Sequence, residues 1–212
     1  MTLLPLRPDE LLTTTRSVRK RLDLDRPVPL DVVRECLEVA LQAPTGGNQQ
    51  TWHWIVVIDP ALRAQIGEYY RRSFTAYRDT RGEARGSAEK VAATARVATS
   101  ADWLAEHMGD VPVHVIACLF TGTDELPAGN QAGLWGSLLP AAWSYQLAAR
   151  ARGLGSAWTT LHLVYEKEIA ELLRIPSKVH QGVLLPTAYF TGETFRPAHR
   201  EPLDSVLHVD RW

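Results

Sequence analysis

Residues 42–58, QAPTGGNQQTWHWIVVI, join a turn, a cluster of amides and an apolar strand in one continuous stretch. Pro44 lacks a backbone N–H and Gly46-Gly47 favour a tight turn, so a helix cannot continue through it. The aromatic and β-branched residues 52–58 predict a buried strand. Two interpretations of the amides at residues 48–50 remain open. They either present hydrogen-bonding groups to a planar polar ligand from a rigid loop, or belong to an ordinary helix–turn–strand connection.

Length and composition limit the possible classes. A chain of 212 residues is long enough for one substantial core, so we expect a single domain over residues 1–212. The net charge of −1 gives no reason to expect a nucleic acid or an anionic membrane as a partner. Cys36 and Cys118 both lie among apolar residues, which favours small buried thiols in a reducing, cytoplasmic protein. No apolar run approaches the ~20 residues that span a bilayer, and no signal peptide is evident.

The remaining chain alternates amphipathic helices with apolar strands. Asp31 is a plausible N-cap for the second helix, and Gly153 suits the left-handed residue that ends a long helix. We expect helices beginning at residue 8 and over residues 30–42, 60–70, 101–108, 131–150 and 164–173. We expect further strands over 111–120 and 181–191, and a short strand or extended segment over 157–161.

Two regions do not fit this alternation. Residues 75–100 are rich in Arg, Ala, Thr and Gly, so they can be partly helical but bury little, and we expect an exposed excursion or lid over residues 75–108. Aromatic residues in and beside it either stack on a flat electron acceptor or anchor the excursion to the core: Tyr69, Tyr70, Phe74, Tyr77 and Trp103. The tail, residues 192–212, carries Leu203, Val206, Leu207, Val209 and Trp212. Apolar residues at that density need a cover, and a partner subunit is a natural one.

Four cations and a hydroxyl fall within residues 16–21, RSVRKR. One interpretation is a solvated basic loop. The other is an anion cradle, in which guanidinium groups make bidentate contacts to a phosphate and Ser17 adds a donor.

The sequence lacks the motifs of several catalytic classes. It contains no GxGxxG before a helix, no P-loop and no GxSxG nucleophile elbow, and its seven histidines lack metal-ligand spacing. We therefore predict no metal site and no protein-supplied catalytic residue. That absence points to a borrowed cofactor or to a binding protein.

Four short motifs, in this order, resemble the nitroreductase family of FMN-dependent oxidoreductases. They are Arg16-Ser17-x-Arg19, residues 43–52 (APTGGNQQTW), residues 152–158 (RGLGSAW) and Arg200-x-Pro202-Leu203. Each motif is weak alone, but the set spans nearly the whole chain. The likeness is nearest to actinobacterial nitroreductase-like members.

The resemblance implies a fold, a partner and a reaction. We expect an α+β subunit with a mostly antiparallel central sheet flanked by helices, and a homodimer with FMN at the subunit interface. The C-terminal tail, residues 192–212, would be exchanged and extend the partner's sheet. NADH or NADPH would deliver a hydride to FMN and leave. A nitroaromatic, a quinone or another electron-poor small molecule would then take the electrons.

The resemblance also assigns thirteen cofactor-binding residues. The phosphate and ribityl cradle would be Arg16, Ser17, Arg19 and Arg200, with the Arg19 cation near the pyrimidine edge. The partner's loop would supply Pro44, Thr45, Gly46, Asn48 and Gln50. The segment against the buried flavin face would be Trp158, Thr159, Thr160 and Leu161, with a backbone N–H directed at flavin N5.

The chain also departs from the family pattern. Thr15 stands where an arginine is common, so the phosphate site would depend more on Arg200 or Lys20. Arg21 stands where Phe is common and Thr51 where Pro is common. Two alternatives to a nitroreductase-like enzyme stay open: a flavin-binding or flavin-storage protein, and a specialised enzyme for reductive dehalogenation or flavin fragmentation.

Overall fold

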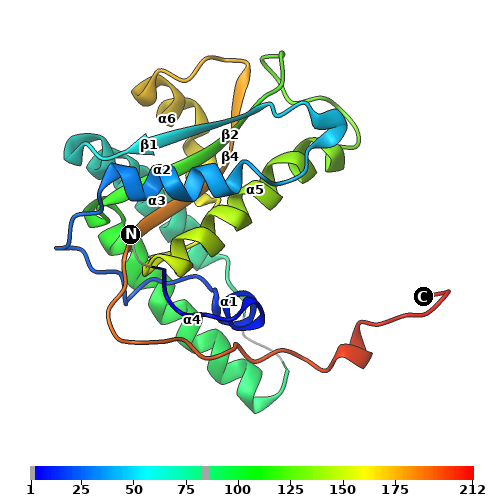
Figure 1. The fold of residues 1–212 in the computed structure, drawn as a ribbon. Helices are drawn as coiled ribbons and strands as arrows, with labels where there is room; N and C mark the ends of the chain where they lie inside the picture. Colours follow the sequence, from blue (N-terminus) through cyan, green and yellow to red (C-terminus); the bar gives the residue numbers. More distant parts are fainter. Residues whose placement is uncertain (1–2, 83–85) are drawn as a thin grey trace.

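The computed structural model describes residues 3–82 and 86–212, and its strands form one antiparallel sheet in the order β1-β2-β4-β3 (Figure 1). The strands are β1 Trp52–Val57, β2 Val113–Phe120, β3 Leu154–Ser156 and β4 Val179–Tyr189. The helices are α1 Pro8–Thr14, α2 Leu30–Ala40, α3 Pro60–Asp79, α4 Ala88–His107, α5 Ala132–Ala151 and α6 Glu166–Leu173. An antiparallel sheet flanked by helices confirms the predicted α+β class.

Helices cover the sheet on both faces, which explains the nearly continuous apolar sequence of β2. Val115 and Ala117 face the core built with α2 and α5, whereas Ile116 and Cys118 face the core built with α3, α4 and α6. Burial raises the pKa of the Cys118 thiol, and likewise that of Cys36, to about 12. Both cysteines are free and buried, as predicted.

Residues 75–100 bury little, as predicted, but they are more helical than expected. Helix α3 continues to Asp79, and α4 begins at Ala88 with its first turn capped by Ser87, whose hydroxyl accepts from the Lys90 amide at 3.3 Å. None of the described residues between 75 and 100 is buried, and α4 is anchored by Leu104 near its C-terminal end. Residues 83–85 of the expected excursion lie outside the described residues.

One predicted local feature is confirmed in part and one is wrong. Of the short strand or extended segment expected at residues 157–161, Thr159 forms an isolated antiparallel bridge with Leu184 of β4. The strand itself, β3, is Leu154–Ser156, which follows the turn at Gly153 with φ +76°. Asp31 is not an N-cap. The Pro29 carbonyl already accepts from Val32, so α2 begins at Leu30 and Asp31 lies inside its first turn.

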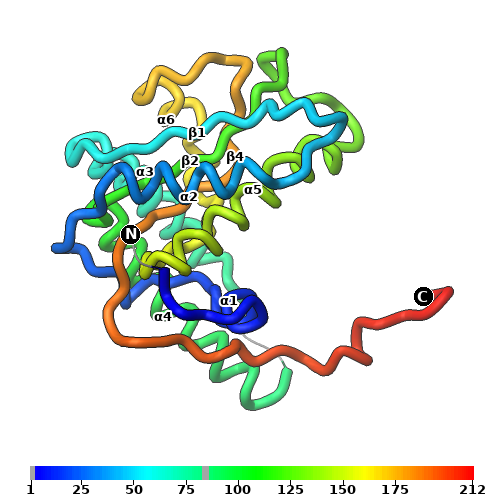
Figure 2. The backbone as a smooth tube through the Cα atoms, in the orientation of Figure 1, coloured from blue at the N-terminus to red at the C-terminus, as the bar shows by residue number. Residues whose placement is uncertain are grey.

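The last twenty residues extend along and then away from the body, and the C-terminus lies far from the sheet (Figure 2). The apolar side chains named above remain exposed there, and Trp212 is fully so. Across the described residues, no helix combines the length and the apolar character needed to cross a membrane.

Candidate functional site

The basic segment and the segment after β3 lie side by side, although about 140 residues separate them in sequence. The Val18 amide donates to the Ser156 carbonyl at 2.8 Å, and the Trp158 amide donates to Ser17 Oγ at 3.3 Å. Ser17 and Ser156 form an isolated parallel bridge. These bonds fix the predicted cradle against the predicted ring-facing segment.

A cleft of about 410 Å³, here called the anion cleft, opens beside this junction. Arg16, Ser17, Arg19 and Arg200 line it, so the structure brings together all four residues predicted for the cradle. Helix α4 forms part of its wall. The remaining lining residues are Ala93, Arg96, Val97, Ser100, Pro197, Ala198 and His199.

The positive charge in the anion cleft is not neutralised by the described part of the chain. None of its four arginines forms an ion pair there. Arg16 Nη1 donates only to the Arg196 carbonyl at 3.1 Å, and Arg200 Nη1 only to the carbonyl of His199. Burial lowers the pKa of Arg19 from its usual value, Tyr70 opposes that shift, and nearby Arg16 and Arg81 add to it. Guanidinium groups stay charged under such conditions, so the cleft suits a multiply charged anion.

A second cavity, of about 330 Å³, adjoins the anion cleft and shares Arg19 and Val97 with it. We call it the aromatic cavity, because Tyr70, Phe74 and Tyr77 of α3 line one side. The other lining residues are Arg81, Ala101, Trp158, Thr159, Thr160 and Leu161. Aromatic walls beside a charged cleft suit a flat ring joined to an anionic group.

The backbone of residues 158–161 leaves one amide open at this cavity. Trp158 donates to Ser17 Oγ, Thr159 donates to the Leu184 carbonyl at 3.1 Å, and Leu161 approaches Thr159 Oγ1 at 3.5 Å. The Thr160 amide donates no hydrogen bond within residues 3–82 and 86–212, and Thr160 is exposed. Thr160 lines the aromatic cavity, so its unpaired amide is a candidate donor to a ligand there.

The loop at residues 44–50 lies elsewhere, near the beginning of α5, and lines neither cavity. Its Gly46 amide donates to Ser137 Oγ at 3.0 Å, and Gln50 Nε2 donates to Asn48 Oδ1 at 2.9 Å. Asn48 and Gln50 both have positive φ, +55° and +50°, an uncommon conformation outside glycine. Within one subunit, therefore, Pro44, Thr45, Gly46, Asn48 and Gln50 stay apart from the cradle.

Sequence reasoning missed the residues of α4 that line the anion cleft, Arg96 and Ser100, and also Arg81 of the aromatic cavity. Of the aromatic residues considered for stacking, Tyr70, Phe74 and Tyr77 do line that cavity. Arg96 lies in the stretch of small polar residues interpreted as an excursion or lid, where an isolated charge was its only signal. Lys20, considered as a substitute phosphate ligand, lines a neighbouring hollow with Arg21 instead of the anion cleft.

Other polar groups are structural. The described residues contain no cluster of His, Cys, Asp or Glu that could hold a metal ion. Burial lowers the pKa of His162 to about 3 and that of His114 to about 4. Both imidazoles are therefore neutral core groups near neutral pH.

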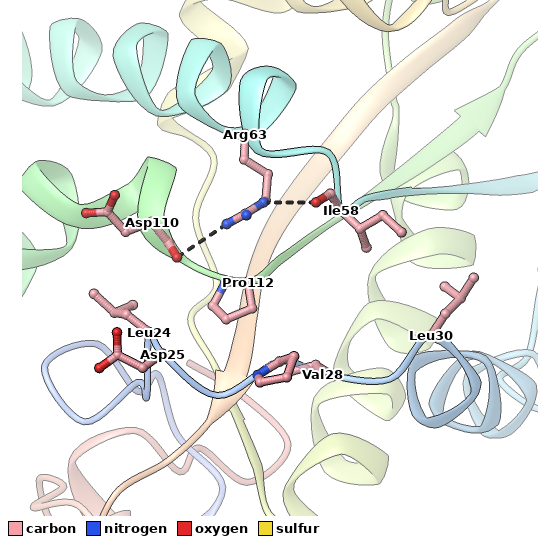
Figure 3. Close-up of a pocket in the computed structure, with 9 residues that line it drawn as sticks. Leu24, Asp25, Val28, Leu30, Ile58, Arg63, Asp110 and Pro112 are labelled. Atoms are coloured by element: carbon pink, nitrogen blue, oxygen red, sulfur yellow. Dashed lines mark hydrogen bonds between the residues drawn. The ribbon is translucent and has the colours of Figure 1, made fainter.

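Another cavity, of about 320 Å³, lies where α3, the end of β1 and residues 24–30 meet (Figure 3). Its cation, Arg63, already donates to the backbone carbonyls of Ile58, Gly109, Asp110 and Val111. A guanidinium satisfied in this way holds the fold together. The contrast with the unpaired arginines makes the anion cleft the stronger candidate for ligand binding.

Several curated relatives match over most of the chain. A putative NADH dehydrogenase/NAD(P)H nitroreductase from Methanothermobacter thermautotrophicus is 25% identical over 207 residues, 96% of this chain and 86% of the relative. An iodotyrosine deiodinase from Thermotoga neapolitana is 27% identical over 182 residues, 84% of this chain and 86% of the relative. These relatives do not support the expected nearest likeness to actinobacterial members.

Solved structures share the fold. An FMN- and NADPH-dependent nitroreductase, an NfnB variant from Sphigopyxis sp., superposes with a TM-score of 0.73 at 18% identity, covering 98% of this chain and 100% of that one. An iodotyrosine deiodinase bound to FMN and 3-iodo-L-tyrosine gives 0.69 at 22% identity, with 96% and 98% coverage. The family model for nitroreductases matches residues 12–189. The chain therefore belongs to the nitroreductase family and is an oxidoreductase of that family.

Proposed function

We propose that this chain is an FMN-dependent oxidoreductase that takes electrons from NADH or NADPH and reduces electron-poor acceptors such as nitroaromatics and quinones. One observation carries the proposal. Unpaired arginines gather in a cleft that continues, through Arg19, into an aromatic cavity beside residues 158–161.

The residues present fit the two ends of FMN. Arg16, Ser17, Arg19 and Arg200 supply three guanidinium groups and a hydroxyl, the donor set that suits a phosphate dianion. Ser17 Oγ accepts from the Trp158 amide, so its own hydroxyl proton remains free to donate. The phosphate would bind in the anion cleft.

The isoalloxazine ring would lie in the aromatic cavity against Trp158, Thr159, Thr160 and Leu161. Bound FMN supplies the hydride chemistry, accepting hydride at N5 and passing electrons onward. The open Thr160 amide is our candidate for the donor to N5. Arg19 lies where the two cavities meet, so its positive charge would favour the anionic form of the reduced cofactor.

The site is proposed to be completed by a second copy of the chain. The loop residues Pro44, Thr45, Gly46, Asn48 and Gln50 would contact the partner's FMN, and the tail at residues 192–212 would cross onto the partner. Two features support this. The loop is almost entirely exposed, and the sheet ends in β1, whose outer edge pairs with no strand among the described residues and could be extended by a tail.

A specific observation favours a second candidate, reductive dehalogenation. Iodotyrosine deiodinases appear among both the curated relatives and the similar structures. In addition, Arg81 stands over the rings of Phe74 and Tyr77, at 4.9 and 4.8 Å, so the aromatic cavity carries a cation beyond Arg19. A halogenated phenol that ionises would suit such a wall.

The test uses the purified full chain. A yellow protein that NADH or NADPH bleaches without oxygen, and that a nitroaromatic or quinone recolours, supports the oxidoreductase. Recolouring by a halogenated phenol with halide release, and not by the other acceptors, selects the dehalogenase. A yellow protein that neither nucleotide bleaches selects flavin storage. A colourless protein that takes up no FMN overturns the proposal.

The phosphate assignment has its own test. Arg200→Ala should weaken FMN binding by about 1.5–3 kcal/mol, the value of a charge-assisted contact, and leave riboflavin binding unchanged. Lys167→Ala removes an exposed cation from α6, away from both cavities, and serves as the control. Equal FMN affinities for the two variants would remove Arg200 from the site.

A further inference from the structure

We infer that Arg96 of α4 is a phosphate-binding residue of the FMN site and that the phosphate holds α4 against the body. This inference rests on the proposed function. It adds to the cradle predicted from sequence a binding residue from a separate helix.

The first argument is the position of Arg96 on α4. Arg96 and Ser100 are four residues apart, so they lie on one face of the helix, and both line the anion cleft together with Arg16 and Arg200. The cleft therefore has guanidinium groups on three separate elements: the segment after α1, helix α4 and the tail. Donors on several sides can share the oxygens of one phosphate group.

The second argument is the pairing of the charged side chains of α4. The other described cation of α4, Lys90, pairs with Glu201 at 3.5 Å, whereas Arg96 has no acidic partner among the described residues. Thr15, the neighbour of Arg16, cannot add a charge, and its hydroxyl donates to the Leu11 carbonyl at 2.6 Å. Among the described residues, Arg96 is the cation of α4 that lines the cleft without an acidic partner.

The third argument is the uneven packing of α4. Its C-terminal half is anchored by the buried Ala101, Leu104 and Ala105, but the half that contains Arg96 has no buried residue. The Lys90–Glu201 pair joins that half to the tail, next to Arg200, and an exposed pair of this kind contributes little. A phosphate shared by Arg96, Arg16 and Arg200 would supply the missing attachment.

This attachment has a consequence for the neighbouring cavity. Val97 lines both cavities and Ala101 lines the aromatic one, so α4 is a wall common to the two. A phosphate that fixes Arg96 also fixes the wall beside the ring. FMN should therefore order this part of α4, whereas riboflavin, which lacks the phosphate, should not.

Flavin titration of the apoprotein tests the binding role. Arg96→Gln should weaken FMN binding by about 10- to 100-fold and leave riboflavin binding within about twofold, while Arg96→Lys keeps the charge and retains part of the affinity. Lys167→Gln is the matched control for loss of one exposed charge, and circular dichroism checks that each variant is folded. Unchanged FMN affinity in Arg96→Gln, together with a loss in Arg200→Ala, overturns this inference and leaves the proposed function intact. If the wild type binds neither flavin, the proposed function itself fails.

Hydrogen exchange provides a readout independent of affinity. At saturating ligand, FMN should slow exchange of the α4 amides around Arg96 more than riboflavin does, and Arg96→Gln should abolish that difference. Equal protection of α4 by the two flavins in the wild type would show that the phosphate does not hold the helix.

Discussion

The ring-facing segment, residues 158–161, and the loop at residues 44–50 were both predicted to contact FMN, yet they differ in their hydrogen bonding and in their exposure. The first is fixed by hydrogen bonds to Ser17 and Leu184, and its Thr159 hydroxyl donates to the Tyr70 hydroxyl at 3.2 Å. The loop is exposed and holds its shape mainly through its own polar groups and the bond to Ser137.

The difference separates the part of the site that one subunit completes from the part that needs another surface. Residues 158–161 already border a cavity with Arg19 and α3, whereas residues 44–50 border neither cavity. A preformed wall should respond to changes in the core, and the exposed loop should respond to changes in assembly.

A fall in pH should have the largest effect on the free energy of unfolding. It should act beside the preformed wall, residues 158–161. Buried His162, which follows Leu161, and buried His114 stay neutral in the fold but take up protons below about pH 6.5 when unfolded. Their stabilisation is complete above pH 6.5 and is lost as the pH falls toward their folded pKa values of about 3 and about 4. At pH 5 each of the two histidines should lower the free energy of unfolding by about 2 kcal/mol relative to pH 7. Urea unfolding at both pH values would measure this loss.

The variant His162→Phe separates this contribution from that of the carboxylates. It should remove roughly half of the histidine-dependent loss between pH 7 and pH 5, whereas His53→Gln, at an exposed position on β1, should remove none. Identical pH dependence in wild type and His162→Phe would contradict the assignment.

Removal of residues 203–212 should have the next largest effect. It should weaken assembly, to which the exposed loop at residues 44–50 is expected to respond. The truncation keeps Arg200 and the Glu201 pair but deletes the exposed Leu203, Val206, Leu207, Val209 and Trp212. If these residues cover a partner, the dimer should weaken at least about 100-fold, roughly 2.8 kcal/mol, in sedimentation velocity. A truncated chain that still sediments as a tight dimer would show that the tail is not the cover.

Gly155→Ala should have an intermediate effect, on the junction between cradle and wall. A Cβ at residue 155 would lie 2.9 Å from Val18 Cβ, so Val18 and its neighbours Ser17 and Arg19 must shift. We expect a loss of about 1–3 kcal/mol in unfolding free energy, with weaker FMN binding. Gly133→Ala is the control, because nothing lies within 4 Å of its added Cβ. Equal behaviour of the two variants would mean that the junction is loose.

Asn48→Gly should have the smallest effect on stability. Glycine accepts the φ of +55° at this position, so the change removes only the amide side chain that accepts from Gln50. The unfolding free energy should stay within about 0.5 kcal/mol of wild type, while FMN binding should weaken about 10-fold if the loop contacts the partner's cofactor. Unchanged FMN affinity would place the loop outside the site.

The local elements were largely predictable because hydrophobic periodicity reflects burial. Residues 52–58 and 111–120 predicted strands, and the structure has β1 at Trp52–Val57 and β2 at Val113–Phe120. Residues 157–161 show the limit of that signal. They have strand composition and Thr159 bridges to Leu184, but the Trp158 amide donates to Ser17, a residue remote in sequence, and the strand β3 is Leu154–Ser156.

The sequence by itself determined the main helices and strands, the buried cysteines and the basic segment at residues 16–21, since each follows from residue type and local pattern, while the α+β class and Arg200 came from the family resemblance. Only the tertiary structure decided which residues share a cavity. It placed Arg96 in the same cleft as Arg16 and kept residues 44–50 away from both cavities. The physical reason is that a binding site forms where elements distant in sequence pack together, and that packing depends on the geometry of the whole sheet and its helices.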